Sequence, residues 1–296
     1  MASVQDLKRR VRSVKNTRKI TRAMELVAAA KLRRAEQRIT ALRPYAESMN
    51  ELIAGVGRAS SSVRGLPLLQ QREEVKTVAV VALTGDRGLA GPFNAQIIRR
   101  AFALERQLRG EGKQAHFIAV GKRGRSTLAF RGYEVLGEYT GFTDRPAYSD
   151  AQAIAHRVAE LYIEGEIDSA LLVYNAFVSP LVQTVTEQEL LPISADILET
   201  DEEERRDDVM RGDFIFEPEP EEILERLLPV YLETQIYRAL LESTASEQGA
   251  RMTAMRNSSK NAGELIDSLT LSMNRARQAE ITQEILEIVA GAEALY

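Results

Sequence analysis

Apolar residues recur every three or four positions over the first part of the chain, the spacing of a helix that packs along one stripe. Ser3 and Asp6, three positions apart, form a capping-box pattern that predicts where this helix begins. Pro44 falls inside it, and because the register continues beyond the proline we expect a kink there and not an end. The pattern predicts a coiled-coil helix over residues 1–57, followed by a linker over 58–74. The two lines of its seam are Leu7, Val14, Thr21, Ala28, Ala35, Leu42, Met49 and Val56, and Val4, Val11, Arg18, Glu25, Leu32, Ile39, Ala46 and Ile53.

This seam has one polar gap, formed by Arg18, Thr21 and Glu25. A single charged position would be an ordinary solvated residue, but three polar seam positions in succession interrupt the contact between two helices. Two interpretations remain open. Either the partner helix diverges at the gap, or another protein takes its place.

Helical spacing returns after Pro218 and Pro220 and predicts a second coiled-coil helix over residues 221–296, with a bend at Pro229. Either seam alone would expose a long apolar stripe, so the simplest arrangement pairs the two helices antiparallel. The second seam consists of Leu241, Ala245, Met252, Met255, Ser259, Ala262, Ile266, Leu269, Met273 and Ala276. The last turns predict a slender apolar tip, carried by Ile281, Ile285, Ile288 and Val289.

Strand and helix patterns alternate in the middle of the chain, which predicts a Rossmann-like α/β domain over residues 75–192 and an acidic connecting segment over 193–220. The near-continuous apolar run KTVAVVAL at 76–83 is typical of a buried parallel strand. Further strands are predicted over 115–120, 133–139, 167–174 and 182–191, the last at a sheet edge, and helices over 93–108, 122–130 and 147–164. The expected fold class is α+β/α/β: a long antiparallel coiled coil formed by the N- and C-terminal helices plus this Rossmann-like domain.

The composition narrows the possible chemistry. With 296 residues, 44% hydrophobic and 28% charged, the chain is a folded protein, and no apolar run reaches the length that spans a bilayer. Zero cysteines exclude disulfides, cysteine zinc sites and thiol catalysis. His116 and His156 are interpreted as structural, and no nucleophile, base and acid stand at a convincing spacing. We therefore predict no catalytic residues, no cofactor and no metal.

Charge is segregated along the chain. Residues 1–43 hold thirteen Lys or Arg against three Asp or Glu, and residues 187–225 hold sixteen Asp or Glu against three Arg. A basic arm predicts an anionic partner, which could be an acidic protein, a membrane surface or nucleic acid. The alternative of a basic coiled-coil nucleic-acid-binding protein predicts aromatic residues among the basic ones, and Tyr45 is the one aromatic residue in this arm.

A glycine-rich turn follows the first predicted strand, with glycines at 85, 88 and 91. This spacing is not the dinucleotide fingerprint, the lysine of a phosphate loop is absent, and Pro92 removes one amide donor from the following helix. An enzyme that binds a dinucleotide is thus a weak alternative. We interpret the segment as a tight turn that exposes Asp86 and Arg87 as a candidate protein contact.

Four stretches together resemble a known family. They are SVKNTRKITRAM at 13–24, Asp86-Arg87-Gly88-Leu89 followed by Gly91, ASEQGARM at 245–252, and ARQAEITQE at 276–284. In this order they are similar to the signatures of the gamma subunits of F-type ATP synthases, along nearly the full chain. Ala90 stands where the family often has cysteine. No long insertion precedes the acidic stretch, and the redox dithiol of the plastid type needs cysteines that this chain lacks, so thiol regulation is not expected.

The resemblance implies a rotor shaft that is not itself an enzyme, with one copy in each complex. The terminal helices would turn inside a hexamer of alternating alpha and beta subunits. The globular domain would bind the epsilon subunit and the ring of membrane c subunits, and would meet the delta subunit and peripheral stalk only indirectly. Nucleic acid is not an expected partner. The expected location is peripheral, on the cytoplasmic face of the bacterial plasma membrane.

The resemblance also implies ten partner-contact positions. Those facing the lever tips of the beta subunits are Lys19, Met24 and Arg87, and those facing a beta-subunit catch loop are Arg277 and Gln278. Positions tied to coupling or to helix pairing are Arg251, Thr282, Glu284 and Glu287. Glu217 belongs to the foot that meets the ring.

Overall fold

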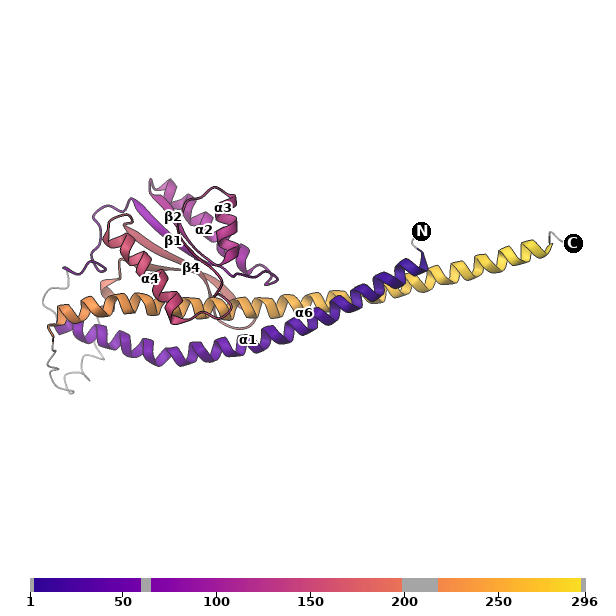
Figure 1. Cartoon of the computed structure of the whole chain (residues 1–296), viewed down its shortest axis with the longest axis horizontal. Helices are drawn as coiled ribbons and strands as arrows, with labels where there is room; N and C mark the ends of the chain where they lie inside the picture. The colour runs from indigo at the N-terminus through magenta and orange to yellow at the C-terminus, as the bar shows by residue number, and fades with distance from the viewer. Residues whose placement is uncertain (1–2, 60–64, 199–217, 294–296) are drawn as a thin grey trace. The chain divides into compact units, whose positions relative to one another are not determined.

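The computed structural model describes residues 3–59, 65–198 and 218–293 (Figure 1). Its contacts divide the chain into two compact units, which we call the helical unit (Met1–Ala29 with Arg251–Tyr296) and the sheet unit (Ala30–Ala250). Two long helices, α1 (Val4–Ala59) and α6 (Pro220–Glu293), contribute residues to both units. Glu217, predicted to lie in the foot, is outside the described residues.

Helix α1 begins where its cap predicts. The Ser3 hydroxyl accepts a hydrogen bond from the Asp6 amide (3.2 Å) and donates one to the Asp6 carboxylate (3.1 Å). The helix continues through Pro44, as its uninterrupted register indicated. Of the sixteen predicted seam positions, all but Arg18 are buried or half-buried, so the heptad pattern identified the packed face.

The sheet unit contains a five-stranded sheet in the order β3-β2-β1-β4-β5. Strands β1 to β4 are parallel, and β5 pairs antiparallel to β4 at the edge. The strands are β1 (Thr77–Leu83), β2 (Gln114–Val120), β3 (Val135–Tyr139), β4 (Ser169–Phe177) and β5 (Gln183–Leu191). The remaining helices are α2 (Phe93–Gly110), α3 (Lys122–Phe130), α4 (Tyr148–Ile163) and the short 3-10 helix η2 (Ala195–Leu198). Every predicted element is present, which confirms the α/β alternation.

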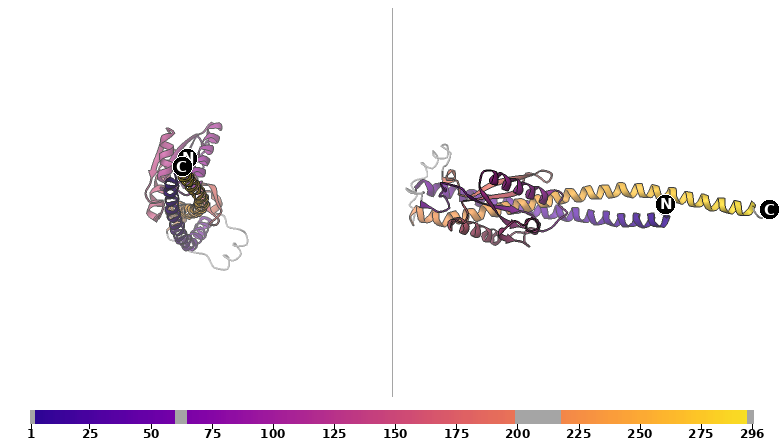
Figure 2. Two further views of the ribbon diagram at one scale, coloured as in Figure 1. Left: turned by 90° about the vertical axis from the view of Figure 1, so that its right-hand side faces the viewer. Right: turned by 90° about the horizontal axis from the view of Figure 1, so that it is seen from above.

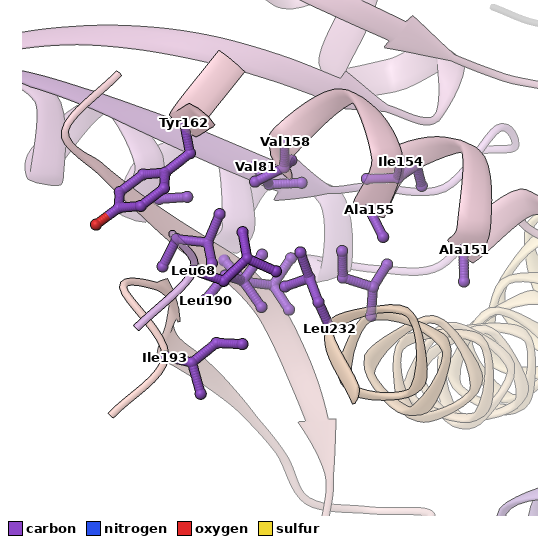
Figure 3. Close-up of a cluster of buried hydrophobic side chains, with 14 of the residues drawn as sticks. Leu68, Val81, Ala151, Ile154, Ala155, Val158, Tyr162, Leu190, Ile193 and Leu232 are labelled. Atoms are coloured by element: carbon purple, nitrogen blue, oxygen red, sulfur yellow. The ribbon is translucent and has the colours of Figure 1, made fainter. Parts of the chain in front are cut away.

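Both faces of the sheet are covered, which is why β1 is apolar and buried at every position after Thr77. On one face Val78, Val80 and Ala82 join a core with α2 and α3. On the other face Val81 joins a larger core with α4 and with the sheet-unit part of α6, where Leu232 packs beside Leu190 (Figure 3). This second core fixes α6 along the sheet.

In the helical unit α1 and α6 run antiparallel. Glu25 pairs with Arg256, whereas Arg18, two turns nearer the start of α1, lies against Gly263, two turns further along α6. Leu7 and Ile266 are among the buried seam residues. Helix α6 continues past the start of α1 (Figure 2). The side chains of residues 277–291 are all exposed. Within the described ranges, none of the helices is both long and apolar enough to cross a membrane.

Candidate functional site

The polar gap of the seam is an open groove in the helical unit, with a volume of about 900 Å³. Side chains of both helices line this groove, and Arg256 of α6 reaches Glu25 of α1 across it, so neither of the two interpretations that the sequence left open is decided. Seven of the lining side chains are cations and one is a carboxylate, so the groove attracts anions. The lining residues are Arg12, Lys15, Asn16, Arg18, Lys19, Arg22, Glu25, Arg256, Ser259, Lys260 and Ile266.

Glu25 is the buried carboxylate of this groove, with 5% of its surface exposed. It forms ion pairs with Arg22 in its own helix (2.7 Å) and with Arg256 in α6 (3.1 Å). Burial acts to raise the pKa of Glu25, but the hydrogen bonds from Arg256 and Arg22 outweigh it and hold the pKa below its usual value. The charged Glu25 thus links the two helices. Arg256 was missed by sequence reasoning, although a glutamate at a seam position is a signal that a cation must face it.

The predicted contact residues of the helical unit have different environments. Lys19 is exposed in the groove, and Met24, one turn further, is half-buried. Arg251 is buried, with 8% exposed, which suits a role in helix pairing better than an open contact.

The other five predicted residues of this unit lie together on the exposed end of α6. They are Arg277, Gln278, Thr282, Glu284 and Glu287. The Thr282 hydroxyl donates to the Gln278 carbonyl (2.8 Å), and the Gln283 amide donates to the Glu287 carboxylate (3.0 Å), so these contacts stay within the helix. The outward faces of the five residues are therefore available to a partner.

Arg87 lies in the sheet unit, in the turn after β1, and Asp86 holds this turn in place. The Asp86 carboxylate accepts hydrogen bonds from the amides of Lys122 (3.0 Å), Gly141 (2.9 Å) and Thr143 (3.2 Å) and from the Thr143 hydroxyl (3.0 Å). Burial acts to raise the pKa of Asp86, but these four donors outweigh it and lower the pKa.

The same turn exposes two neighbouring side chains. Arg87 is exposed, and its carbonyl accepts a hydrogen bond from Asn94 (3.2 Å). Leu89 is 64% exposed and has a φ of 62°, which a leucine rarely adopts. Leu89 therefore combines a strained backbone with an exposed apolar side chain beside Arg87. The sequence carries no signal for its backbone angle, so it was not among the predicted residues.

The geometry of this turn does not suit a phosphate. The Gly85 amide donates to Asn94 (2.7 Å) and the Asp86 amide to the Thr143 hydroxyl (2.8 Å), so both donors are occupied. The Glu247 carboxylate lies 2.8 Å from where a Cβ of residue 85 would be, and it would repel an anion. The cavity here measures about 10 Å³, room for roughly one water molecule. A dinucleotide therefore does not fit this end of the sheet. Among the described residues, no group of three or more His, Cys, Asp or Glu side chains could hold a metal ion.

Comparisons with known proteins agree over the whole chain. A family model described as ATP synthase matches residues 3–295. The ATP synthase gamma chain of Rubrobacter xylanophilus is 48% identical over 295 residues, covering 100% of this chain and 99% of the relative. That of Moorella thermoacetica is 48% identical over 297 residues and covers both chains fully.

Solved structures agree as well. A chain from the central stalk and c-ring structure of the Tetrahymena thermophila mitochondrial ATP synthase superposes with a TM-score of 0.58 at 26% identity, covering 80% of this chain and 98% of the other. A chain from the rotor of the Euglena gracilis mitochondrial ATP synthase has a TM-score of 0.65 at 17% identity, covering 94% and 98%, and shows the shared fold. On the full-length identity to the bacterial relatives, the chain belongs to the family of ATP synthase gamma chains.

Proposed function

We propose that this chain is the central-stalk rotor of an F-type ATP synthase and has no catalytic site of its own. The helical unit turns inside the hexamer of alpha and beta subunits, and the sheet unit binds the epsilon subunit and the c-ring. Proton flow through the ring turns the chain, which drives ATP synthesis at the beta subunits, and hydrolysis turns it backwards. The complex holds one copy, peripheral to the cytoplasmic face of a bacterial plasma membrane. The names of the relatives support this assignment.

The exposed end of α6 is the observation that carries the proposal. Residues 277–291 form helix with every side chain exposed, although Ile285 (55%) and Ile288 (71%) are apolar. Exposed apolar side chains gathered on one segment mark an interaction surface. A surrounding protein sleeve would cover them, and because most of these contacts are apolar and non-directional, the helix could turn inside it.

The shape of the helical unit also suits a rotor. A hexamer with threefold repetition can be driven through three states only by an axle that lacks that symmetry. Here α6 extends beyond α1, and the basic groove interrupts the seam, so the shaft presents unequal sides. We propose that acidic lever tips of the beta subunits meet this groove at Lys19 and Met24, by charge complementarity.

The remaining predicted residues take roles along the same axle. Arg87 meets the lever tips from the sheet unit, and Arg277 with Gln278 binds a catch loop of a beta subunit. Thr282, Glu284 and Glu287 face the sleeve, and Arg251 supports helix pairing. Glu217 belongs to the foot on the ring. At a membrane potential of about 200 mV, the passage of one proton supplies about 4–5 kcal/mol of free energy, which is more than a typical hydrogen bond contributes. The torque must therefore be shared among several contacts between the rotor and its partners.

The nucleic-acid alternative has less support. The groove is basic, but none of its lining side chains is aromatic, so it lacks the stacking platforms that single-stranded nucleic acids use. An acidic protein surface matches the same charge without that requirement. The relatives from Rubrobacter xylanophilus and Moorella thermoacetica are both ATP synthase gamma chains.

The test is Met24→Lys in the complex reconstituted with its cognate alpha, beta and epsilon subunits and c-ring. We expect ATP hydrolysis to persist while ATP-driven proton pumping falls several-fold, because the new cation would form an ion pair with an acidic lever tip where Met24 offers an apolar side chain, and that ion pair would oppose release of the tip as the rotor turns. The matched control is Ala23→Lys, at the exposed neighbouring position. Equal pumping in Met24→Lys and wild type would contradict the assigned contact, and failure of the wild-type chain to join these subunits would contradict the rotor assignment.

A further inference from the structure

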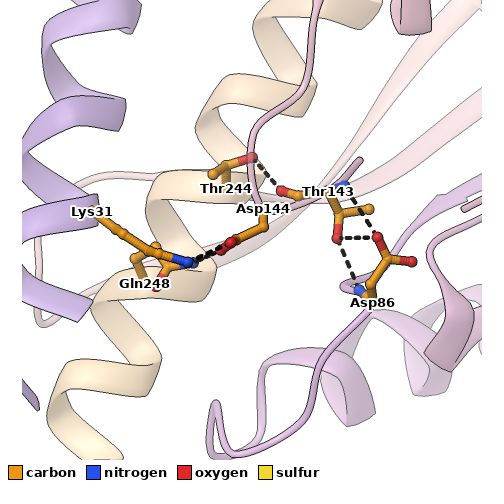
Figure 4. A network of polar contacts seen from close by, with 6 residues as sticks. All are labelled: Lys31, Asp86, Thr143, Asp144, Thr244 and Gln248. Carbon is orange, nitrogen blue, oxygen red and sulfur yellow. Dashed lines mark hydrogen bonds and ion pairs between the residues drawn. The ribbon is translucent and has the colours of Figure 1, made fainter. Parts of the chain in front are cut away.

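The loop between β3 and α4, residues 140–147, touches the turn after β1 and both long helices. We call it the clamp loop. All of its contacts described below lie within the sheet unit, and Figure 4 shows the central ones. On the sheet side, Thr143 exchanges hydrogen bonds with Asp86: its hydroxyl and amide donate to the carboxylate, and the hydroxyl accepts from the Asp86 amide. The loop is thereby joined to the turn that carries Arg87.

The same loop contacts both α1 and α6 through the side chain of Asp144. One carboxylate oxygen forms an ion pair with Lys31 of α1, and the other accepts a hydrogen bond from the Gln248 amide of α6 (2.9 Å). The pair is two-thirds buried, with 33% of each side chain exposed. A single carboxylate therefore bridges the two helices.

Backbone carbonyls of the loop add a second set of contacts. The Thr244 hydroxyl of α6 donates to the Thr143 carbonyl (2.9 Å), and the Arg38 guanidinium of α1 donates to the Pro146 carbonyl and to the Tyr237 hydroxyl of α6 (3.0 Å). These bonds are directional, so each fixes an angle as well as a distance.

The position of these contacts is informative. Lys31 is the second residue of the sheet unit on α1, and Gln248 lies two residues before the unit ends on α6, so the loop grips each helix where it leaves the unit. Further from that boundary, α6 packs on the sheet through apolar side chains such as Leu232, and it also accepts hydrogen bonds at Glu233 from the Tyr148 hydroxyl (2.8 Å) and at Gln235 from the Gln188 amide (3.1 Å). Those contacts hold α6 alone, whereas the clamp loop holds α1 and α6 together.

We infer that the clamp loop fixes the rotational register of α1 and α6 against the sheet unit, with Asp144 as its positioning residue. Torque that enters the sheet unit then turns both helices through the same angle, and the Arg87 turn keeps its orientation relative to them. This inference rests on the proposed rotor function.

The test is Asp144→Ala in the reconstituted complex, with protons pumped per ATP hydrolysed as the readout. We expect this ratio to fall about threefold or more, while the rate of ATP hydrolysis stays within about twofold of wild type. Both are measured at a temperature well below that at which the variant unfolds. The exchange Lys31→Asp with Asp144→Lys restores the ion pair, and we expect it to recover most of the ratio. Gln248 can serve the exchanged pair if its amide turns over, because its Oε1 has no hydrogen-bond partner within the described chain and would then accept from the lysine at position 144.

Two further variants keep the result interpretable. Thr244→Val removes one clamp bond with little change of shape and should lower the ratio less than Asp144→Ala; it replaces Asp144→Ala if that variant does not fold. Glu222→Ala removes an exposed ion pair of α6 with Arg226 (2.6 Å) and should leave the ratio unchanged. A normal ratio in the clamp variants beside a coupled wild type overturns the clamp and leaves the rotor assignment standing. An uncoupled wild-type complex overturns both.

Discussion

Helix α6 passes through two different environments. In the sheet unit it is part of the core: Leu224 and Ile236 are fully buried, and each residue from 243 to 250 is buried. In the helical unit only a narrow stripe is buried, including Met255, Ala262 and Ile266, and after Ala276 no side chain up to 291 is covered. One helix can thus be structural core over one half and exposed over the other. The burial of α6 differs because the sheet and α4 cover it in the sheet unit, whereas only α1 contacts it within the described part of the helical unit. We therefore expect side chains of α6 to contribute more to the free energy of unfolding in the sheet unit.

The comparison can be tested most strongly by deleting equivalent side chains from the two regions. Ile236→Ala opens a cavity at a position with 0% exposure and should lower the free energy of unfolding by about 3 kcal/mol or more. Ile266→Ala, at 7% exposure on the two-helix stripe, should cost about 1–2 kcal/mol. Eight of the nine tyrosines lie in the sheet unit, so tyrosine fluorescence during urea unfolding reports on that unit while circular dichroism follows all helices. Equal losses would remove the distinction between the two regions.

The tightness of the sheet unit is probed at Gly85. A Cβ there would lie 2.8 Å from the Glu247 carboxylate, which is 3% exposed and has little room to move. Gly85→Ala should therefore cost about 2 kcal/mol in thermal unfolding. Adding Glu247→Ala should recover part of the loss, because it removes the group in collision. Gly110→Ala, where no atom would lie within 4 Å, is the control and should not destabilise.

The helical unit should show a weaker, pH-dependent effect at Glu25. Its folded-state pKa lies below the ordinary 4.5, so the charged form stabilises the fold at pH values above 4.5. This contribution disappears as the pH falls from 4.5 through the lower folded pKa. Glu25→Gln removes it at neutral pH, at a cost of about 1 kcal/mol because both arginines are more than half exposed.

The measurement for Glu25 is helix content against pH by circular dichroism, for wild type and Glu25→Gln. The variant should show a shallower loss between neutral pH and the acid range. Glu264→Gln is the matched control, since Glu264 is exposed and pairs with Lys260 at 4.0 Å. Parallel curves for Glu25→Gln and wild type would show that the ion pairs across the seam do not stabilise the unit.

The smallest effect is expected at the exposed pair Arg226–Glu222 on α6. Arg226→Ala should change the free energy of unfolding by less than about 0.5 kcal/mol, since solvent screens exposed ion pairs. Urea unfolding of this variant, measured beside that of Ile236→Ala, gives the smallest change in the free energy of unfolding expected in this series. A loss above about 1 kcal/mol would mean that this stretch is more tightly packed than its exposure indicates.

The elements of the fold were predictable because their signals are local. The apolar run of β1, the heptads of α1 and the proline before α6 each lie within one short window of sequence. The clamp loop was not predictable, since Lys31 and Asp144 are 113 positions apart and meet only through the topology of the sheet. For the same reason Arg256 was not matched with Glu25, 231 positions away.

The candidate site was predictable to a different degree. Its residues came from a resemblance, which gives positions but no geometry. The buried state of Arg251 and the backbone angle of Leu89 required coordinates. The interaction roles of Lys19 and Arg277 depend on surfaces supplied by other chains, so neither the sequence nor the fold of this chain determines them.

The bare end of α6 has a consequence for assembly. Without tertiary contacts, a stretch such as 277–291 is held by its own backbone hydrogen bonds alone, and short helices in that condition are marginally stable in water. Its amide hydrogens should exchange with deuterium far faster than those near Leu232 in the isolated subunit. Enclosure by neighbouring subunits would slow that exchange. The deuterium uptake of these few turns would therefore measure how completely the other subunits have enclosed the rotor.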